Sequence, residues 1–396
     1  MNIIKNIKHP KIILGGFLAL MMLSTISGSY SYILDSIKID LSLNYTQIGS
    51  LMSAYFLGYT FGQIPWGFLA DRYGGRKIIS SSVFLASIVT GFFGYSSNFF
   101  LAFLTRFLSG LLGAGVFVPS VKMISGWYKS GERGTALGLM NIGGSVGLIL
   151  ITWISPLLAT LFNWRNSLVI QCIFGVTLSS IIWLSIRDGV TSKTNARIEL
   201  RTAFTRSSFW ILAFAQFIRL GCYYTFIAWL PQVFKEDYNL NVLTISGAMS
   251  LFNIAGMISN PIGGMLSDKI GEKTVMLISF SFLSIGLLGF VVIPLGDFLF
   301  LESFLLGWFI NFIRSPSFTI IPRFFGLEYA GSISGFQNTF ASLGALFLPL
   351  VLGAVKDVTM SYSFGWIILI ALIIINTILM VIMKIPVKAD ILLSSD

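Results

Sequence analysis

Long apolar runs occupy most of the chain, and short polar stretches separate them. A helix crosses a bilayer with about 20 apolar residues at a rise of 1.5 Å each. The runs are long and lack the alternation of a β-strand, so they predict membrane-spanning helices. The predicted spans are 12–34, 47–69, 77–95, 99–126, 134–160, 164–186, 208–231, 243–266, 274–294, 298–322, 331–355 and 361–383. We therefore predict an all-α membrane protein with twelve transmembrane helices.

The longest polar connection covers residues 187–207 and carries several basic residues. It predicts a cytoplasmic linker between an N-terminal six-helix bundle, 1–186, and a C-terminal six-helix bundle, 208–396. The first apolar run is too long for the hydrophobic part of a signal peptide and leads into a second span. We therefore expect it to be retained as a helix.

Composition narrows the class of protein. Hydrophobic residues make up 55% of the chain, charged residues only 11%, and the mean hydropathy is +0.84. An ordinary soluble domain is about 25% charged. These values exclude a soluble enzyme, a disordered chain and a nucleic-acid binder. Two cysteines, one histidine and no Walker A loop predict that no metal, cofactor or nucleotide is bound.

Basic residues predict the orientation. Of the 26 Lys and Arg, four fall within spans and only four in the loops that face outward when both termini are placed inside. Those outward residues are Lys38, Arg165, Lys235 and Lys356. The remaining 18 fall in the inward segments, which is a strong positive-inside bias. Both termini are therefore predicted to be cytoplasmic, in a bacterial inner or plasma membrane.

An internal repeat divides the chain. The stretch Asp71–Lys77 has a looser copy, Asp268–Lys273, that begins 197 residues later. The same offset relates Gly67 to Gly264, Pro119 to Pro316, Gly134 to Gly331 and Asn141 to Asn338. Two parallel repeats are typical of alternating-access transporters.

These motifs resemble a known family. The stretch Gly67–Lys77 resembles the loop 2–3 signature of the major facilitator superfamily, and Arg106 followed by Gly110 and Gly113 resembles its helix 4 motif. The resemblance covers essentially the whole chain. It implies two pseudo-symmetric six-helix bundles, with helices 1, 4, 7 and 10 lining a central cavity.

Less specific motifs, which related branches share, resemble the anion:cation symporter branch of that superfamily. They are Gly58–Pro65, Glu132–Gly134, Trp164–Arg165 and the segment from Tyr223 to Pro231. One departure is that the positions near Ile26 are uncharged, whereas the branch usually has an arginine in helix 1. The helix 5 Gly-Pro motif of drug antiporters is also absent from this sequence.

Charges within spans indicate the site. A charged residue at the centre of a spanning helix costs about 2.5–3.5 kcal/mol on insertion scales. Arg219 is about 16 Å into its predicted span and Arg314 about 14 Å into its own, both near the middle of the bilayer. No Asp or Glu lies at comparable depth. An arginine fork binds carboxylate or phosphate in a bidentate manner, so we predict that both arginines bind an anionic substrate. The alternative is that they brace helices.

Other candidates surround this pair or occupy the other half of the chain. Gln216 and Tyr223 share a helical face with Arg219, and Asn311 shares one with Arg314. Tyr30 and Tyr59 place hydroxyls in or near the cavity that the resemblance implies. We predict that these five side chains complete the substrate site.

Gating and coupling residues follow mainly from the resemblance. It implies that Asp71, Arg72 and Arg76, with the repeat residue Asp268, form an inner latch.

The remaining charged candidates concern coupling. Arg106 is interpreted either as a coupling residue or as a packing residue. The acids Asp35 and Glu302, near the outer ends of spans, are candidates for proton coupling.

The sequence thus predicts a secondary transporter, not an enzyme, that moves a small organic anion by alternating access. A carboxylate, a sugar acid and a phosphorylated metabolite are all compatible, as are proton symport, exchange against a counter-anion and uniport. The alternatives are an exporter of hydrophobic or drug-like compounds and a transport-like ligand sensor. We expect a monomer in contact with membrane lipid.

Overall fold

The computed structural model describes residues 9–128, 130–187, 204–292, 298–325 and 330–384. The side chains of a few further residues, Asp71 and Asp268 among them, lie outside the described part. The chain divides into two compact units, Met1–Lys193 and Thr194–Asp396. The predicted linker, 187–207, lies almost entirely outside the described residues.

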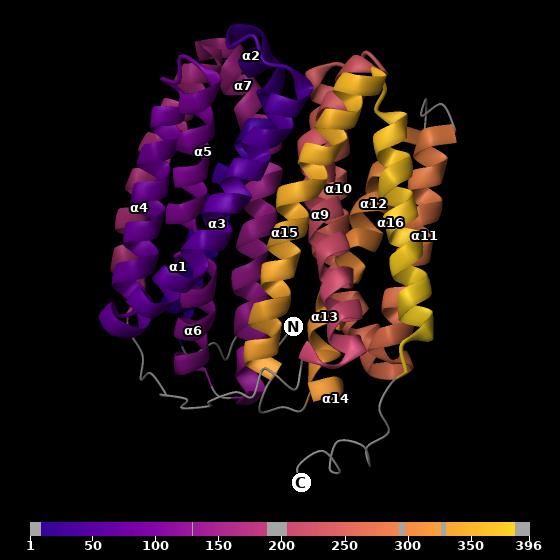
Figure 1. The fold of residues 1–396 in the computed structure, drawn as a ribbon. Coiled ribbons are helices and arrows are strands. Elements are labelled where there is room, and N and C mark those ends of the chain that lie inside the picture. The colour runs from indigo at the N-terminus through magenta and orange to yellow at the C-terminus, as the bar shows by residue number, and fades with distance from the viewer. Residues whose placement is uncertain (1–8, 129, 188–203, 293–297, 326–329, 385–396) are drawn as a thin grey trace. The chain divides into compact units, whose positions relative to one another are not determined.

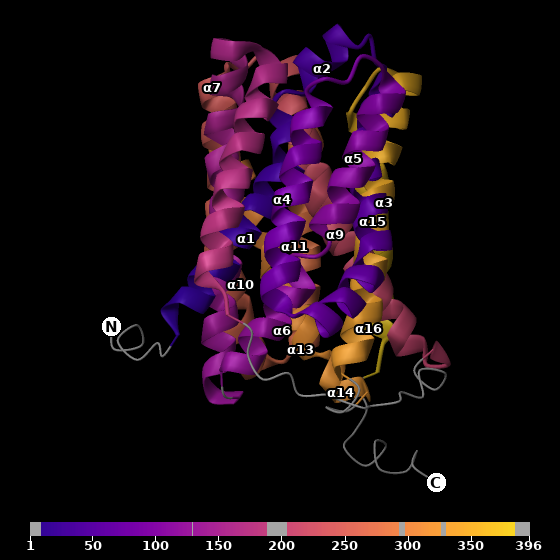
Figure 2. The same ribbon diagram turned by 90° about the vertical axis from the view of Figure 1, so that its left-hand side faces the viewer.

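Unit 1 is a helical bundle (Figure 1). Its elements are α1 (Pro10–Gly28), the 3-10 helix η2 (Ser29–Tyr32), α2 (Leu34–Asp40), α3 (Tyr45–Tyr73), α4 (Gly75–Phe93), α5 (Phe99–Gly113), α6 (Phe117–Trp127) and α7 (Ser130–Ser185). Within α7, Asn163 has φ 66° and ψ 165°, so α7 consists of two helical stretches joined at a kink. Helix α1 packs against α7, and α4 runs beside α7 (Figure 2).

Unit 2 is built in the same way. Its elements are α9 (Ser207–Glu236), α10 (Val242–Ile270), α11 (Glu272–Val292), α12 (Leu299–Phe312), α13 (Arg314–Thr319), α14 (Ile321–Phe325), α15 (Ala330–Thr359) and α16 (Ser363–Ile382). Helix α9 packs against α15, and α10 packs against α12.

The sequence repeat is present in the backbone. Among the described residues, positive φ angles occur at three pairs of positions, and the members of each pair are 197 residues apart. The pairs are Ser42 and Asn239 (52° and 52°), Gly74 and Gly271 (86° and 90°), and Asn163 and Met360 (66° and 56°). Because left-handed backbone is uncommon outside glycine, this coincidence shows that both units follow the same chain path.

Equivalent asparagines begin equivalent helices. The Asn44 side chain accepts a hydrogen bond from the Gln47 backbone at the start of α3, and Asn241 accepts one from the Thr244 backbone at the start of α10. Each bond satisfies one of the backbone N–H groups that a helix start leaves unpaired. The repeat therefore extends to the capping chemistry.

Two predicted helices are broken. The structure divides the predicted span 99–126 between α5 and α6, and the span 298–322 among α12, α13 and α14. Proline explains both breaks, because Pro119 and Pro316 lack the N–H that would bond the carbonyl four residues earlier. The break in unit 2 places Arg314 at the first residue of α13.

Ten helices within the described residues are long and apolar enough to cross a membrane. One of them, 136–185, contains the kink at Asn163 and covers two predicted spans. The prediction of a helical membrane protein with two similar bundles is therefore confirmed, while the count of twelve stays a prediction.

Candidate functional site

The arginine cluster (Gln216, Arg219, Tyr223, Arg314 and Ser317) lies inside unit 2, where α9 meets α13. Arg219 is only 5% exposed and lies twelve residues into α9, about 18 Å from Ser207 along the helix. Its guanidinium lies 5.9 Å from the centre of the Phe318 ring of α13. The cluster is therefore deep in a membrane-spanning segment and mostly shielded by protein.

A chain of hydrogen bonds connects the two helices. Arg219 Nε donates to Gln216 Oε1 at 2.8 Å, and Gln216 Nε2 donates to Ser317 Oγ at 3.1 Å. Ser317 Oγ in turn donates to the Arg314 carbonyl at 2.8 Å. The structure thus brings together the predicted residues Arg219, Gln216 and Arg314, and adds Ser317.

Most of the donor capacity in this cluster is unused. An arginine carries five N–H groups. Within the described residues, Arg219 uses only its Nε, and the Arg314 guanidinium makes no hydrogen bond or ion pair. The two arginines lie on packed helices and are connected through Gln216 and Ser317. The cluster therefore presents a concentrated positive charge with free donors.

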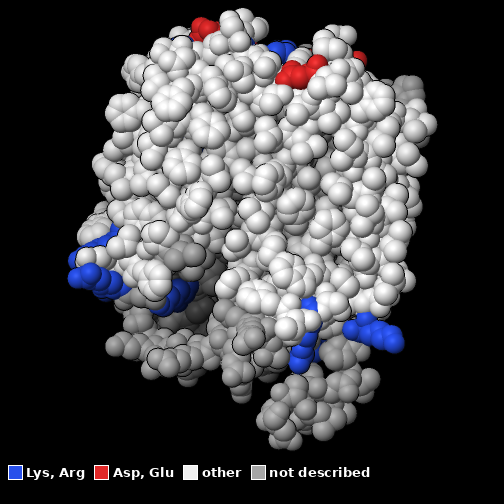
Figure 3. Space-filling view, in the orientation of Figure 1, with Lys and Arg blue, Asp and Glu red and all other residues white. Residues whose placement is uncertain are grey.

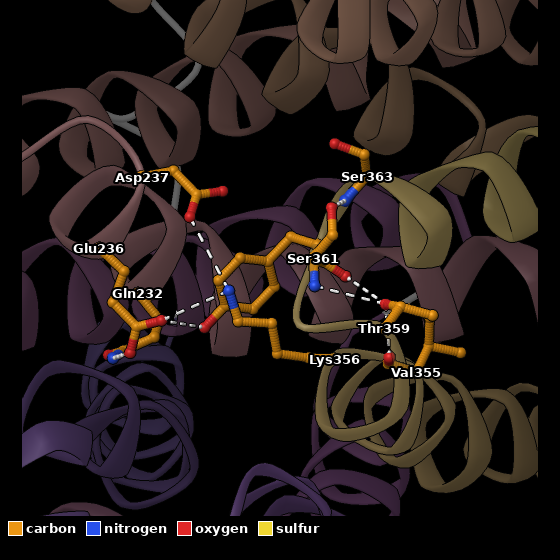
Figure 4. Close-up of polar contacts among 9 residues, drawn as sticks. Gln232, Glu236, Asp237, Val355, Lys356, Thr359, Ser361 and Ser363 are labelled. Carbon is orange, nitrogen blue, oxygen red and sulfur yellow. Dashed lines mark hydrogen bonds and ion pairs between the residues drawn. The ribbon is translucent and has the colours of Figure 1, made fainter.

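The carboxylates of unit 2 that the structure describes lie elsewhere. At the end of α9, the Lys356 ammonium lies between Glu236 and Asp237, 3.9 Å from an oxygen of each, and Tyr362 donates to Glu236 at 2.9 Å (Figure 4). Burial raises the pKa of Asp237, and the charge of Lys356 opposes that shift. These acids are neutralised locally.

Two further acids of unit 2, Glu272 and Glu302, have contacts away from the arginine cluster. Glu272 forms an ion pair of 3.1 Å with Arg323. Glu302 faces Gly286 of α11, and its buried Oε1 has no hydrogen-bond partner within the described residues. Glu302 as a whole is half-buried, so only one of its two oxygens is enclosed without a partner.

Asn311 is not part of the cluster. Its Nδ2 donates to the Gly307 carbonyl of its own helix at 2.9 Å, and its amide packs so closely on α10 that a Cβ on Gly256 would overlap it. Asn311 therefore makes its printed contacts with α12 and α10, and its predicted role beside Arg314 stays a prediction.

Arg106 has a different environment, inside unit 1. It is 2% exposed, and it donates from Nε to the Leu51 carbonyl at 3.3 Å and from Nη1 to the Ile26 carbonyl at 3.2 Å. Its guanidinium lies 5.1 Å from the Tyr30 ring and 4.8 Å from the Tyr55 ring. These contacts join α5 to α1 and α3, which favours the packing interpretation of Arg106.

The predicted tyrosines belong to unit 1. The Tyr30 hydroxyl donates to the Ile48 carbonyl, and its ring lies against Arg106. Tyr59 stacks on Tyr55, with ring centres 6.3 Å apart. The half-buried Asp35 lies in α2.

The latch residues that can be described have local partners. Arg76 donates to the Trp183 carbonyl at 2.8 Å and lies 4.3 Å from the Trp183 ring, so it caps the end of α7. Its repeat counterpart Lys273 does the same in unit 2, donating to the carbonyls of Val381 and Met383. The exposed Arg72 lies over the ring of Tyr73.

The comparisons agree with this architecture. The family model of the Major Facilitator Superfamily matches residues 12–349 and 212–391. The chain belongs to the major facilitator superfamily. It is a transporter and a multi-pass membrane protein, as the sequence predicts.

Relatives of this transporter are named for anions of several kinds, with sugar acids, sulfoacetate and nitrite among them. It is 26% identical over 381 residues to the probable galactarate/D-glucarate transporter GudP of Bacillus subtilis (strain 168), covering 83% of this chain and 81% of that one. It is 27% identical over 372 residues to the probable L-galactonate transporter of Escherichia coli (strain K12), covering 84% and 80%. Both relatives are named as transporters, not enzymes.

A solved structure shares the fold. It is the crystal structure of a bacterial homologue of the human lysosomal transporter Spinster, in an inward-facing and occupied conformation. The TM-score is 0.76 at 16% identity, and the match covers 93% of this chain and 95% of that one.

Proposed function

We propose that this transporter moves a small organic anion by alternating access, and that Arg219 and Arg314 bind the anion. One observation carries the proposal: Arg219 and Arg314 lie on the packed helices α9 and α13, connected through Gln216 and Ser317, with free guanidinium donors and no carboxylate partner among the described residues. Like charges in a medium of low polarity repel strongly. An anionic substrate removes that repulsion and uses the free donors.

A sugar acid fits the cluster best among the compatible anions. Its carboxylate takes the guanidinium N–H groups in charge-assisted bonds, and its hydroxyls match the polar groups of Gln216 and Tyr223. The names of the two relatives, which refer to galactarate, D-glucarate and L-galactonate, support this substrate class. An exporter of hydrophobic cations would be opposed by the same positive charge.

The proposed coupling ion, a proton, is assigned to a residue outside the arginine cluster. We propose Glu302 as a proton carrier in a symport mechanism, because its buried oxygen lacks a partner within the described residues. Exchange of the substrate against a counter-anion is the competing mechanism. The proposed latch contains Asp71 and Asp268, whose side chains the structure does not describe.

The distribution of charge supports the proposed orientation. On the face drawn in Figure 3, basic side chains gather at one end of each unit, acidic ones are found at the other, and an uncharged band lies between them. With the positive-inside rule, we place both termini in the cytoplasm of a bacterial cell, with the transporter in the inner membrane as a monomer.

Uptake into proteoliposomes tests the proposed function. We expect the parent transporter to accumulate labelled D-glucarate or galactonate, and Arg219→Gln and Arg314→Gln each to lower uptake about tenfold to a hundredfold, as the loss of one charged hydrogen-bond donor predicts. Lys235→Gln, which removes a cation from the end of the same helix, should leave uptake unchanged. Normal uptake by both arginine variants would contradict the proposal.

A further inference from the structure

A groove of about 400 Å³ lies on unit 1 between α4 and the second stretch of α7. The two helices run side by side there (Figure 2). The groove is lined by Lys77, Ser80, Phe84, Ser180, Trp183 and Leu184, among others. None of these residues belongs to the proposed transport site.

One end of the groove is cationic and rich in hydroxyls. Lys77 is the third residue of α4, exposed, and in no ion pair within the described residues. Ser80 is only 6% exposed, lines the groove, and its buried Oγ has no hydrogen-bond partner in the described part of the structure. A buried hydroxyl without a partner costs free energy, so this end is suited to an oxygen-rich anion.

The other walls of the groove are apolar and exposed. Phe84 is 40% exposed, Trp183 39% and Leu184 75%. Further exposed apolar residues continue along both helices, Phe92 on α4 and Ile173 on α7 among them. In a membrane-spanning bundle such a face contacts lipid chains, and tryptophan beside lysine is typical of the headgroup level.

The internal repeat supplies a comparison. The positions 197 residues after Lys77, Ser80 and Trp183 hold Thr274, Leu277 and Met380. Unit 2 therefore lacks the lysine, the buried serine and the indole at the equivalent positions, although Thr274 keeps a hydroxyl there. The chemistry of the groove is specific to unit 1 and is not a consequence of the shared fold.

We propose that this groove binds one anionic phospholipid, with the phosphate at Lys77 and Ser80 and an acyl chain along Phe84 and Leu184. Charge complementarity selects the anionic headgroup, because no acid lines the groove. The apolar walls select a lipid over a free phosphate, since a soluble anion would leave them unused.

Native mass spectrometry of the full-length transporter in detergent, with equal amounts of phosphatidylglycerol and phosphatidylcholine, tests the proposal. We expect the parent to retain phosphatidylglycerol preferentially, and Lys77→Gln to lower its affinity about fivefold, as the loss of one lysine near an anionic headgroup predicts. Ser180→Phe, which fills the groove and keeps Lys77, should also lower retention.

Two controls separate the site from general attraction and from phosphate alone. Lys11→Gln removes an exposed cation from the start of α1 without touching the groove and should retain lipid like the parent. Soluble glycerol 3-phosphate should not displace the lipid. Parent-like retention by Lys77→Gln and Ser180→Phe, an equal loss in Lys11→Gln, or displacement by glycerol 3-phosphate would each overturn the proposal.

Discussion

Three buried or half-buried arginines differ in how their donors are used. Arg106 uses Nε and Nη1 on two backbone carbonyls and lies beside two aromatic rings. Arg219 uses only Nε, and Arg314 uses none within the described residues. A satisfied guanidinium joins helices, whereas an unsatisfied one is available to a ligand. Within the described residues, hydrogen bonding therefore distinguishes Arg106, which joins helices, from Arg219 and Arg314, which we propose bind the anion. The sequence shows only that all three are cations within spans.

This difference predicts opposite effects on stability. Arg106→Met removes two charge-assisted hydrogen bonds between helices and should lower the free energy of unfolding by about 2–3 kcal/mol. Arg219→Met removes a charge that Arg314 repels, so it should leave stability unchanged or raise it. Thermal unfolding followed by circular dichroism in detergent measures both. If Arg219→Met is as destabilising as Arg106→Met, Arg219 is a brace and the binding role is wrong.

At the scale of elements, close approach of helices depends on glycine. A Cβ on Gly110 of α5 would overlap the Tyr55 carbonyl of α3, and one on Gly307 of α12 would overlap the Phe252 carbonyl of α10. Gly307 follows Gly110 by 197 residues, and Phe252 follows Tyr55 by the same number. The two units therefore pack equivalent helices through the same kind of contact. Small residues at helix crossings are the usual basis of packing in membranes.

These contacts predict that the effect of a Gly→Ala substitution on stability depends strongly on which glycine is replaced. Gly307→Ala must push α12 away from α10 and should lower the melting temperature clearly. Gly289→Ala in α11 meets nothing within 4 Å and should leave stability unchanged or raise it by up to about 1 kcal/mol, because alanine favours helix over glycine. Thermal unfolding of the two variants side by side checks this. Equal melting temperatures would show that the α10–α12 contact is not tight.

The helix breaks have a functional consequence. Pro316 ends α12 and begins a new helix at Arg314, so Arg314 and Ser317 lie on a short element that faces α9. Discontinuous helices are common at the binding sites of transporters. The sequence places both prolines in the repeat. The amide of Asn311 bonds within α12, and its role in binding stays a prediction.

At the scale of the whole molecule, the two units share a chain path but not the arginines that lie deep within spans. The residues 197 positions before Arg219 and Arg314 are Met22 and Phe117. The equivalent of Arg106 is Ser303. The positions that shape turns and helix contacts are shared, and so are charges near helix ends, such as Arg76 and Lys273. The charges deep within spans are not shared. The proposed anion site is therefore a property of unit 2.

The sequence predicted the class of fold because the length of the apolar runs and the 197-residue repeat can both be recognised without knowing which helices pack together. It also indicated Arg219, Arg314 and Gln216 as candidates, since charges deep in spans are rare, and the structure brings these three residues together. Their role in binding stays a prediction. The sequence could not predict the contact of Ser317 with Gln216, the carbonyl partners of Arg106 or the groove beside Ser80. Those depend on which helices pack together, and serines are too frequent in the chain to stand out.

Equilibrium binding to the purified transporter in lipid nanodiscs tests the anion clamp most directly. Galactarate and galactitol share their stereochemistry and differ in that galactarate carries two carboxylates where galactitol carries hydroxymethyl groups. We predict by calorimetry that the parent binds galactarate or galactonate and not galactitol, and that Arg219→Gln and Arg314→Gln each weaken binding about tenfold or more. Galactitol binding equal to that of the acids, or parent-like affinity in both variants, would contradict the clamp.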